Sequence, residues 1–414
     1  LGYVGLPLAL TFAESNVQVI GFDIDIKKIT YLKNSKSYIK SISNQRIKDA
    51  LKKKLKVTNN FKKVSLLDAI IICLPTPLNK HNEPDLSYIT STVDRIVPFL
   101  KKNQLISLES TTYPGTTDEE IAGRLKSNNF KIGKNFFLVY SPEREDPGNK
   151  YFNTKNIPKI IGGYSKKCLS IGTALYESAL DSIYPVSSTK TAEMTKLLEN
   201  IHRAVNIGLV NEMKIVSDKM NIDIHEVIRA AATKPFGFTP FYPGPGLGGH
   251  CIPIDPFYLT WKAKEYGINT KFIELAGEIN SKMPNWVVSK INETFNLKNK
   301  SINKSKILIL GIAYKKDVND TRESPSLEII NILKNLGALV DYSDPYVPIF
   351  PKLRNYKFKI KNINLNPKKI SSYDAIVICT NHSTFDYKIL AKNAKLIIDT
   401  RGVFSETLKN IVKA

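Results

Sequence analysis

The stretch that decides the fold is residues 1–23, which read LGYVGLPLALTFAESNVQVIGFD. Gly2 and Gly5 precede a helical run, and an apolar strand follows that ends on Asp23. Glycines in such a turn let the backbone approach a pyrophosphate at the positive end of the helix. An acid roughly twenty residues further on suits a ribose hydroxyl. The stretch therefore predicts a dinucleotide-binding turn of the Rossmann type, with Tyr3 and Val4 inside it.

An acid at position 23, where an arginine would suit a phosphate, favours NAD over NADP as the cofactor. The first glycine of the full fingerprint and the strand before it would precede Leu1. Half of the motif also fits a structural strand-to-helix turn, so at this point that alternative stays open.

Apolar runs typical of buried strands occur towards both ends of the chain. Residues 69–74 and 105–108 predict strands of one sheet, and residues 306–311 and 339–342 predict strands of another. Helical periodicity over residues 326–336 separates the last two strands. Strands that alternate with helices indicate parallel sheets covered on both faces.

One run of sequence returns almost unchanged. DAIIIC at residues 68–73 reappears as DAIVIC at residues 374–379, and each run leads into a polar turn. We therefore expect an α/β protein with two Rossmann-like, doubly wound domains of related architecture.

Between these domains, residues 189–219 contain no proline and carry apolar side chains at three- and four-residue steps. The pattern predicts a long central helix that connects the domains or forms a dimer interface. Residues 296–304 are polar and indicate a linker. The expected division is an NAD-binding domain at 1–187, a central helical domain at 188–300 and a second Rossmann-like domain at 301–414.

The four cysteines, Cys73, Cys168, Cys251 and Cys379, are far apart and form no paired Cys or His spacing. This pattern argues against a disulfide framework and against a metal site. No apolar run approaches the roughly 18 residues that cross a bilayer, so we expect a cytoplasmic protein without a membrane partner.

The formal net charge is +22, which a nucleic-acid-binding protein would also show. The lysines are spread along the whole chain, however, and dispersed charge is typical of solvated faces. We expect no nucleic-acid partner, with a basic nucleic-acid-binding protein as the alternative.

The chemistry is concentrated in residues 241–256, FYPGPGLGGHCIPIDP. Glycines and prolines constrain this loop and bring backbone N–H groups close to a ligand. Asp255 and Pro256 resemble an N-cap and a first helical turn, so Cys251 lies just ahead of a predicted helix. The positive potential there favours the thiolate, which makes Cys251 a candidate nucleophile.

Lys196, Asn200 and Arg203 fall at i, i+4 and i+7 on the predicted central helix. They share one face, which is either a solvated polar stripe or a set of donors to an oxyanion beside the cysteine. The spacing alone leaves both interpretations open.

Five motifs now carry a resemblance. YVGLP at 3–7, KLLEN at 196–200, GGHC at 248–251, AYKKD at 313–317 and DTRES at 320–324 resemble, in order, the UDP-glucose/UDP-mannuronic acid dehydrogenase family. The resemblance covers essentially the whole chain. It implies two Rossmann-like domains joined by a long helix that forms the core of a homodimer, and NAD-dependent oxidation of a UDP-sugar.

The resemblance also implies a mechanism. Hydride leaves the sugar C6 to give an aldehyde, which Cys251 captures as a thiohemiacetal, and a second hydride transfer gives a thioester that water hydrolyses. In this scheme Lys196 and Asn200 stabilise the oxyanion, and Asp255 orients proton transfers. Glu143 is the base for hydrolysis, and Thr111 holds water.

Binding residues follow by the same resemblance. NAD would contact Gly2, Tyr3, Val4, Gly5, Asp23, Lys28, Thr76, Ser110, Thr111 and Arg322. The UDP-sugar would contact Arg144, Lys196, Asn200, Arg203, Tyr242, Gly246, Gly248, Tyr314, Lys315 and Arg401.

Two departures bear on the substrate. His250 replaces the serine usual before the cysteine in UDP-glucose enzymes, and Lys234-Pro235-Phe236 stands about where those enzymes have a subunit-crossing arginine. These features are more similar to the branch that oxidises UDP-N-acetylhexosamines. We expect UDP-N-acetylglucosamine as the substrate and surface polysaccharide as the destination of the product. The alternatives are UDP-glucose, UDP-N-acetylmannosamine and an inactive nucleotide-binding scaffold.

Overall fold

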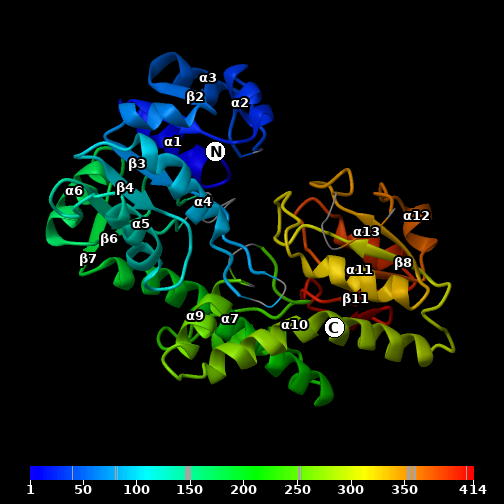
Figure 1. Cartoon of the computed structure of the whole chain (residues 1–414). Helices are drawn as coiled ribbons and strands as arrows, with labels where there is room; N and C mark the ends of the chain where they lie inside the picture. Colours follow the sequence, from blue (N-terminus) through cyan, green and yellow to red (C-terminus); the bar gives the residue numbers. More distant parts are fainter. Residues whose placement is uncertain are drawn as a thin grey trace. The chain divides into compact units, whose positions relative to one another are not determined.

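The computed structural model (Figure 1) describes residues 1–39, 41–79, 81, 83–144, 151–249, 252, 254–351, 356, 358, 360–406 and 408–414. Its contacts divide the chain into two compact units. Unit 1 comprises Leu1–Glu199 and Phe257–Ile268, and unit 2 comprises Asn200–Pro256 and Asn269–Ala414. The three-part division at 1–187, 188–300 and 301–414 stays a prediction.

Unit 1 contains a five-stranded sheet and a separate pair of strands. The sheet has the order β3 (Ala69–Ile72), β4 (Leu105–Leu108), β5 (Phe137–Tyr140), β6 (Lys159–Gly163) and β7 (Ile183–Val186). Strands β1 (Val19–Phe22) and β2 (Leu55–Thr58) form a parallel two-stranded sheet. The predicted strands at 69–74 and 105–108 are thereby confirmed.

One pairing corrects the sequence prediction. β6 runs antiparallel to β5, whereas every other strand pair in unit 1 is parallel. A parallel neighbour requires a crossover connection, usually a helix. Among the described residues between β5 and β6 no helix occurs, and the chain turns back beside β5.

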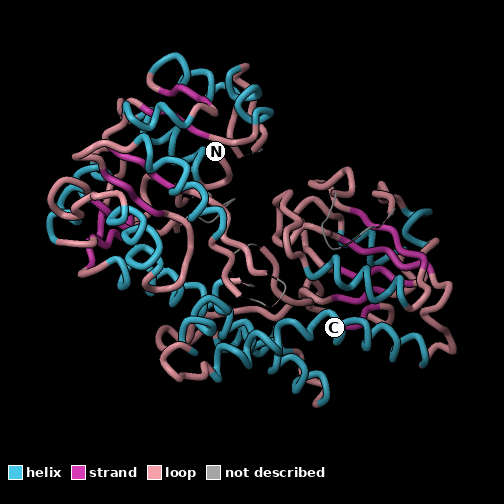
Figure 2. The backbone as a smooth tube through the Cα atoms, viewed as in Figure 1, coloured by secondary structure: helices cyan, strands magenta, loops and turns pink. Residues whose placement is uncertain are grey.

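Helices cover unit 1 on both faces of its sheet (Figure 2). Side chains of α4 (Ser87–Ile96) and α5 (Ala122–Ser127) join one apolar core with β4 and β5, and those of α1 (Gly5–Glu14) and α6 (Lys166–Glu177) join the other. The remaining helical segments are α2 (Ile26–Lys33), α3 (Asn44–Lys53), η1 (Phe61–Leu66), η2 (Val97–Phe99) and η3 (Thr117–Ile121).

Unit 2 contains a wholly parallel sheet. Its order is β12 (Ile411–Lys413), β11 (Ile397–Asp399), β10 (Ala375–Ile378), β8 (Lys306–Leu310) and β9 (Leu339–Ser343). The order reverses at β8, as in a doubly wound fold. The repeated DAI-IC runs thus form β3 in one unit and β10 in the other.

The two faces of β8 show why the sheet is covered on both sides. Ile307 and Ile309 join a core with α10 (Lys271–Asn296) and α11 (Pro325–Asn335). Leu308 and Leu310 join a second core with α12 (Pro367–Ser371) and α13 (Tyr387–Asn393). Successive side chains of a strand point to opposite faces, so a continuous apolar run requires cover on both. The predicted α/β class is confirmed.

The long helix α7 occupies Thr189–Lys219, the range predicted from its periodicity. Two further helices complete the chain, α8 (Ile224–Ala231) and α9 (Asp255–Lys264). The sequence predicts Asp255 as the N-cap of a helix, but Asp255 is itself the first helical residue of α9. Among the residues that the structure describes, no helix combines the length and apolarity needed to span a bilayer.

Two helical glycines in unit 1 give opposite predictions. A Cβ at Gly172 in α6 would fall 2.6 Å from Cγ1 of Val139 on β5, whereas a Cβ at Gly123 in α5 would meet no atom within 4 Å. We expect Gly172→Ala to lower the free energy of unfolding by about 1–3 kcal/mol through overpacking. Gly123→Ala should raise it by about 0.5–1 kcal/mol through helix propensity. Urea unfolding of both variants tests this, and equal effects of one sign would contradict the packing of α6 on β5.

Candidate active site

The glycine-rich turn at the start of unit 1 fits a pyrophosphate. Helix α1 begins at Gly5, and no side chain caps its N-terminus. A Cβ at Gly2 would meet nothing within 4 Å, whereas one at Gly5 would fall 3.3 Å from Cβ of Cys73. Gly2 therefore leaves room for a ligand, and Gly5 lets the turn approach β3. An uncapped helix N-terminus with open space beside it suits an anionic group.

Three of the residues predicted to bind NAD follow the carboxyl ends of strands. Asp23 follows β1, and its carboxylate accepts the N–H of Asp25 at 2.9 Å and lies 3.3 Å from Nζ of Lys28. Thr76 follows β3 and is buried. Ser110 follows β4, where its Oγ accepts the N–H of Leu74 at 2.9 Å. Ligands of open α/β sheets bind outside these ends, so the placement fits a dinucleotide.

Glu143 is held at both carboxylate oxygens in unit 1. Oε1 accepts the N–H of Arg144 at 2.8 Å, and Oε2 lies 3.3 Å from Nζ of Lys159. Arg144 itself donates to the carbonyl of Pro158 at 2.8 Å and pairs with Glu199 at 2.7 Å. Arg144, which the resemblance assigns to the substrate, thus also anchors the loop that carries Glu143.

Next to Thr111, the sequence analysis missed Thr112. The Thr112 hydroxyl is buried and has no hydrogen-bond partner in the part of the chain that the structure describes. Buried hydroxyls are nearly always satisfied, often by an ordered water. Thr112 is therefore a better candidate to hold water than Thr111. The two threonines are adjacent, and the sequence does not reveal which of them is buried.

On α7, the predicted polar face is only partly covered. Lys196 and Asn200 are buried, whereas Arg203 is exposed. In unit 2, Nδ2 of Asn200 donates to Oδ2 of Asp255 at 2.5 Å, and both side chains are buried. Asp255 lies four residues after Cys251 in the sequence. Cys251 and its neighbours His250 and Pro253 lie outside the described residues.

The glycine-rich loop of unit 2 lies against predicted substrate residues. A Cβ at Gly248 would fall 2.6 Å from Cβ of Tyr314, and a Cβ at Gly244 would fall 2.6 Å from Nη1 of Arg401. Gly246 has φ +132°, in the region that favours glycine. Gly248 leaves no room for a side chain, because Cβ of Tyr314 and the carbonyl oxygen of Glu323 lie within 3.0 Å of where its Cβ would fall. The assignment of Gly248, Tyr314 and Arg401 to the substrate stays a prediction.

Two other predicted residues of unit 2, Arg322 and Lys315, either bond to this loop or follow a residue that contacts it. Arg322 pairs with Asp320, at 2.6 Å from Nη2 to Oδ2, and its carbonyl accepts the N–H of Gly249 at 2.9 Å. Lys315 follows Tyr314 and is half-buried.

His225 in α8 was also missed by the sequence analysis. Its ring stacks on Tyr242 with centroids 6.4 Å apart and planes 11° apart. A Cβ at Gly402, next to Arg401, would fall 2.4 Å from Cγ of His225, so the ring underlies that turn. Burial lowers the pKa of His225 to about 4, and its Nε2 has no partner among the described residues. A lone histidine in a helix gives no sequence signal of this contact.

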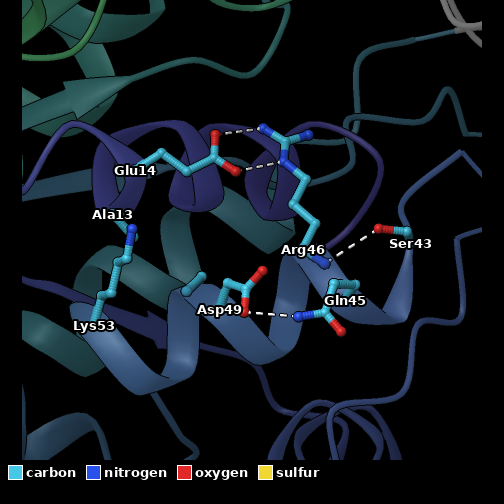
Figure 3. Close-up of a pocket in the computed structure, with 8 residues that line it drawn as sticks. Ala13, Glu14, Ser43, Gln45, Arg46, Asp49 and Lys53 are labelled. Atoms are coloured by element: carbon cyan, nitrogen blue, oxygen red, sulfur yellow. Dashed lines mark hydrogen bonds and ion pairs between the residues drawn. The ribbon is translucent and has the colours of Figure 1, made fainter.

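A pocket of about 380 Å³ in unit 1 lies apart from these residues (Figure 3). It is formed by α1 and the start and body of α3, and Arg46 pairs with Glu14 across it at 2.7 Å. None of its lining residues was predicted to bind a ligand.

A dinucleotide turn, a second doubly wound unit and a glycine-rich loop beside a cysteine define the class of two-domain nucleotide-dependent dehydrogenases. Family models match along the chain. They are the NAD binding domain of the UDP-glucose/GDP-mannose dehydrogenase family at residues 1–180, its central domain at 190–282 and its UDP binding domain at 308–406. The chain belongs to this family and is an NAD-dependent nucleotide-sugar dehydrogenase that uses a UDP-sugar.

Individual relatives match over nearly the whole chain. A UDP-N-acetyl-D-glucosamine 6-dehydrogenase from Salmonella typhi is 35% identical, over 97% of this chain and 95% of the relative. A UDP-N-acetyl-D-mannosamine dehydrogenase from Pyrococcus horikoshii is 34% identical, over 98% and 95% respectively. The solved structure of the UDP-D-ManNAc dehydrogenase from Pyrococcus horikoshii aligns with a TM-score of 0.90 and 32% identity, over 99% of this chain and 96% of that one.

The buried ring of His225 predicts a pH-dependent stability. In the unfolded chain its pKa returns to about 6.5, so the unfolded state takes up a proton first as the pH falls. The contribution of neutral His225 is complete above pH of about 6.5 and is lost as the pH falls through about 4. We expect His225→Gln to flatten the fall in the free energy of unfolding over this window, measured by urea unfolding. Exposed His202→Gln is the control, and an unchanged slope in His225→Gln would contradict the prediction.

Proposed function

We propose that this enzyme oxidises the C6 alcohol of a UDP-N-acetylhexosamine to the carboxylate in two successive hydride transfers, with Cys251 as covalent catalyst. The observation that supports this most directly is the buried hydrogen bond between Asn200 and Asp255. It joins the polar face of α7 to the first turn of α9, which follows the cysteine in the sequence. When bound, NAD supplies the hydride acceptor, and the residues of this chain do the remaining work.

Cys251 precedes α9, a helix of ten residues whose N-terminus adds positive potential. That potential favours the thiolate, which adds to the aldehyde carbon and later leaves. The side-chain amide of Asn200 has two N–H bonds. One of them donates to Asp255, which fixes the orientation of the amide, and the other can donate to the oxyanion. Lys196, one helical turn earlier, contributes a positive charge for the oxyanion.

Hydrolysis of the thioester requires a base and a water molecule. Glu143 supplies the base, and the buried hydroxyl of Thr112, beside Thr111, supplies a site for the water. Water adds its oxygen to the carbonyl carbon and gives a proton to Glu143. The C–S bond then breaks, its electron pair returns to the sulfur of Cys251, and the acid is released.

The proposed binding residues are those that the sequence predicts. We propose that NAD contacts Gly2, Tyr3, Val4, Gly5, Asp23, Lys28, Thr76, Ser110, Thr111 and Arg322. We propose that the UDP-sugar contacts Arg144, Lys196, Asn200, Arg203, Tyr242, Gly246, Gly248, Tyr314, Lys315 and Arg401.

The choice of an N-acetylhexosamine rests on the relatives and on the loop sequence. Relatives named for UDP-N-acetylglucosamine and for UDP-N-acetylmannosamine stand at 35% and 34% identity, so they favour the class and not one isomer. His250 favours the same class. UDP-N-acetylglucosamine is our first candidate, ahead of UDP-N-acetylmannosamine and UDP-glucose. The cytoplasmic location and the use of the product in surface polysaccharide stay predictions.

The proposal predicts the stoichiometry and the residue requirement. UDP-N-acetylglucosamine should yield two NADH per sugar, because an alcohol is oxidised to an acid. Cys251→Ala should lose the complete reaction, by at least about 10³-fold, because no covalent intermediate forms. NADH absorbance with a panel of the three UDP-sugars, and mass measurement of the product, test this. One NADH per sugar, full activity without the thiol, or preference for UDP-glucose would each contradict the proposal.

We also propose a homodimer through α7, because this helix carries exposed apolar side chains. In unit 2 these include Leu209, Met213 and Val216, at three- to four-residue steps. A stripe of this kind on a long helix is typical of a subunit interface.

Charged side chains introduced into this stripe test the dimer. We expect Leu209→Glu combined with Met213→Lys to shift the sedimentation coefficient from dimer to monomer, since the charges would be buried in the interface. Exposed Leu297→Glu, outside α7, is the matched control. A dimer that persists in the double variant would refute the assignment of the interface to α7.

A further inference from the structure

Because β6 is antiparallel to β5, it brings a lysine to the end of the sheet where Glu143 follows β5. Val139 pairs with Gly163 and Tyr140 with Gly162, so the same register continued places position 159 opposite position 143. If β6 were parallel to β5, its first residue would lie at the opposite end of the sheet. Nζ of Lys159 accordingly lies 3.3 Å from Oε2 of Glu143.

Lys159 has a second and closer partner. Its Nζ lies 2.6 Å from Oε2 of Glu109, which follows β4. The other oxygen of Glu109 accepts the hydroxyl of Tyr176 at 2.5 Å, and that hydroxyl also lies 2.8 Å from Oγ of Ser107. Each oxygen of Glu109 therefore contacts one of these two residues, and its side chain is 0% exposed, so no ligand reaches it from solvent.

Because these side chains are buried, their charges interact strongly with one another. The side chains of Lys159 and Glu109 are 5% and 0% exposed, and that of Glu143 is 13% exposed. Burial alone would lower the pKa of Lys159, but Glu109 and Glu143 more than offset it, so the pKa lies above its usual value. The ammonium is therefore charged, with Glu109, Glu143, Tyr176 and Cys73 as the ionisable groups around it.

A purely structural role explains the cluster poorly. A buried ion pair seldom adds stability over apolar residues of similar volume. The only member of the cluster that is partly open is Glu143, whose Oε1 is fixed by the N–H of Arg144. Lys159 fixes its other oxygen, so the carboxylate is held in one orientation by two donors on different segments.

We propose that Lys159 and Glu109 are positioning residues for the hydrolysis step. Lys159 holds the carboxylate of Glu143 in place, and Glu109 with Tyr176 holds Lys159. The inference rests on the proposed function, in which Glu143 takes the proton of the attacking water. It adds that the proton acceptor works only while the buried lysine orients it.

The test separates hydrolysis from the hydride-transfer steps. We compare Glu143→Gln, Lys159→Met, the double variant and Glu109→Gln in the full-length enzyme. In rapid mixing with UDP-N-acetylglucosamine and NAD, the burst of NADH in the first turnover should stay within about threefold of the unmodified enzyme. The following steady state should slow by about 10²-fold or more in Glu143→Gln and in Lys159→Met, as loss of a base implies. Mass spectrometry should show a sugar adduct on Cys251 that accumulates in both.

Coupling distinguishes positioning from damage to the fold. The double variant should be no slower than Glu143→Gln, because the lysine acts only through the glutamate. Glu109→Gln, which keeps the shape of the cluster, should slow the steady state less and should also accumulate the adduct. Lys262→Met is the matched control, since Lys262 is a buried lysine of unit 1 that pairs with two carboxylates, those of Glu119 and Glu265. It should leave the ratio of burst to steady-state rate unchanged.

Each result decides one question. If Glu143→Gln hydrolyses the adduct at the normal rate, the base assignment in the proposed function is wrong. If Glu143→Gln is slow but Lys159→Met is normal, or if the two losses multiply in the double variant, only the positioning inference is wrong. If Lys159→Met fails to fold, Glu109→Gln decides it, because a normal steady state in that variant overturns the inference.

Discussion

The hydrogen bond between Asn200 and Asp255 joins the long helix α7 to the first turn of α9. Both partners are buried, and a buried carboxylate without a donor would cost several kcal/mol. The bond therefore holds the start of α9 against α7. The glycines of the preceding loop allow a similarly close approach, since a side chain at Gly248 would collide with Tyr314.

Regular elements with strong periodicity could be predicted from the sequence. The range of α7 follows from uninterrupted apolar steps, and the strands β3, β8 and β10 follow from continuous apolar runs that only a sheet covered on both faces can bury. Helix α10 was not predicted, because Pro284 and buried Asn280 interrupt the apolar pattern. Tertiary contacts override that local signal, since Asn280 bonds to Asn211 at 2.8 Å and to the carbonyl of Ala204 at 3.0 Å.

The same distinction between local pattern and tertiary contact applies to the candidate site. Lys196 and Asn200 could be placed on one helical face by their spacing, because helix geometry is fixed and local. The exposure of Arg203, the orphan hydroxyl of Thr112 and the ring of His225 beneath Gly402 depend on burial and on contacts far apart in sequence. The direction of β6 could not be predicted either, because the strand sequence is apolar in either orientation. That direction determines whether Lys159 meets Glu143.

Two buried lysines of unit 1 show why burial of the partners matters more than burial of the lysine. Lys262 pairs with Glu119 and Glu265, whose side chains are 42% and 48% exposed, so water solvates the carboxylates and weakens the coupling. Lys159 pairs with carboxylates that are 0% and 13% exposed, so little water screens the charges. Protonation of Glu143 during hydrolysis would then change the field at Lys159 and Glu109 directly. In the proposed mechanism, a proton on Glu143 would leave the positive charge of Lys159 opposite the carboxylate of Glu109 alone, among these three residues.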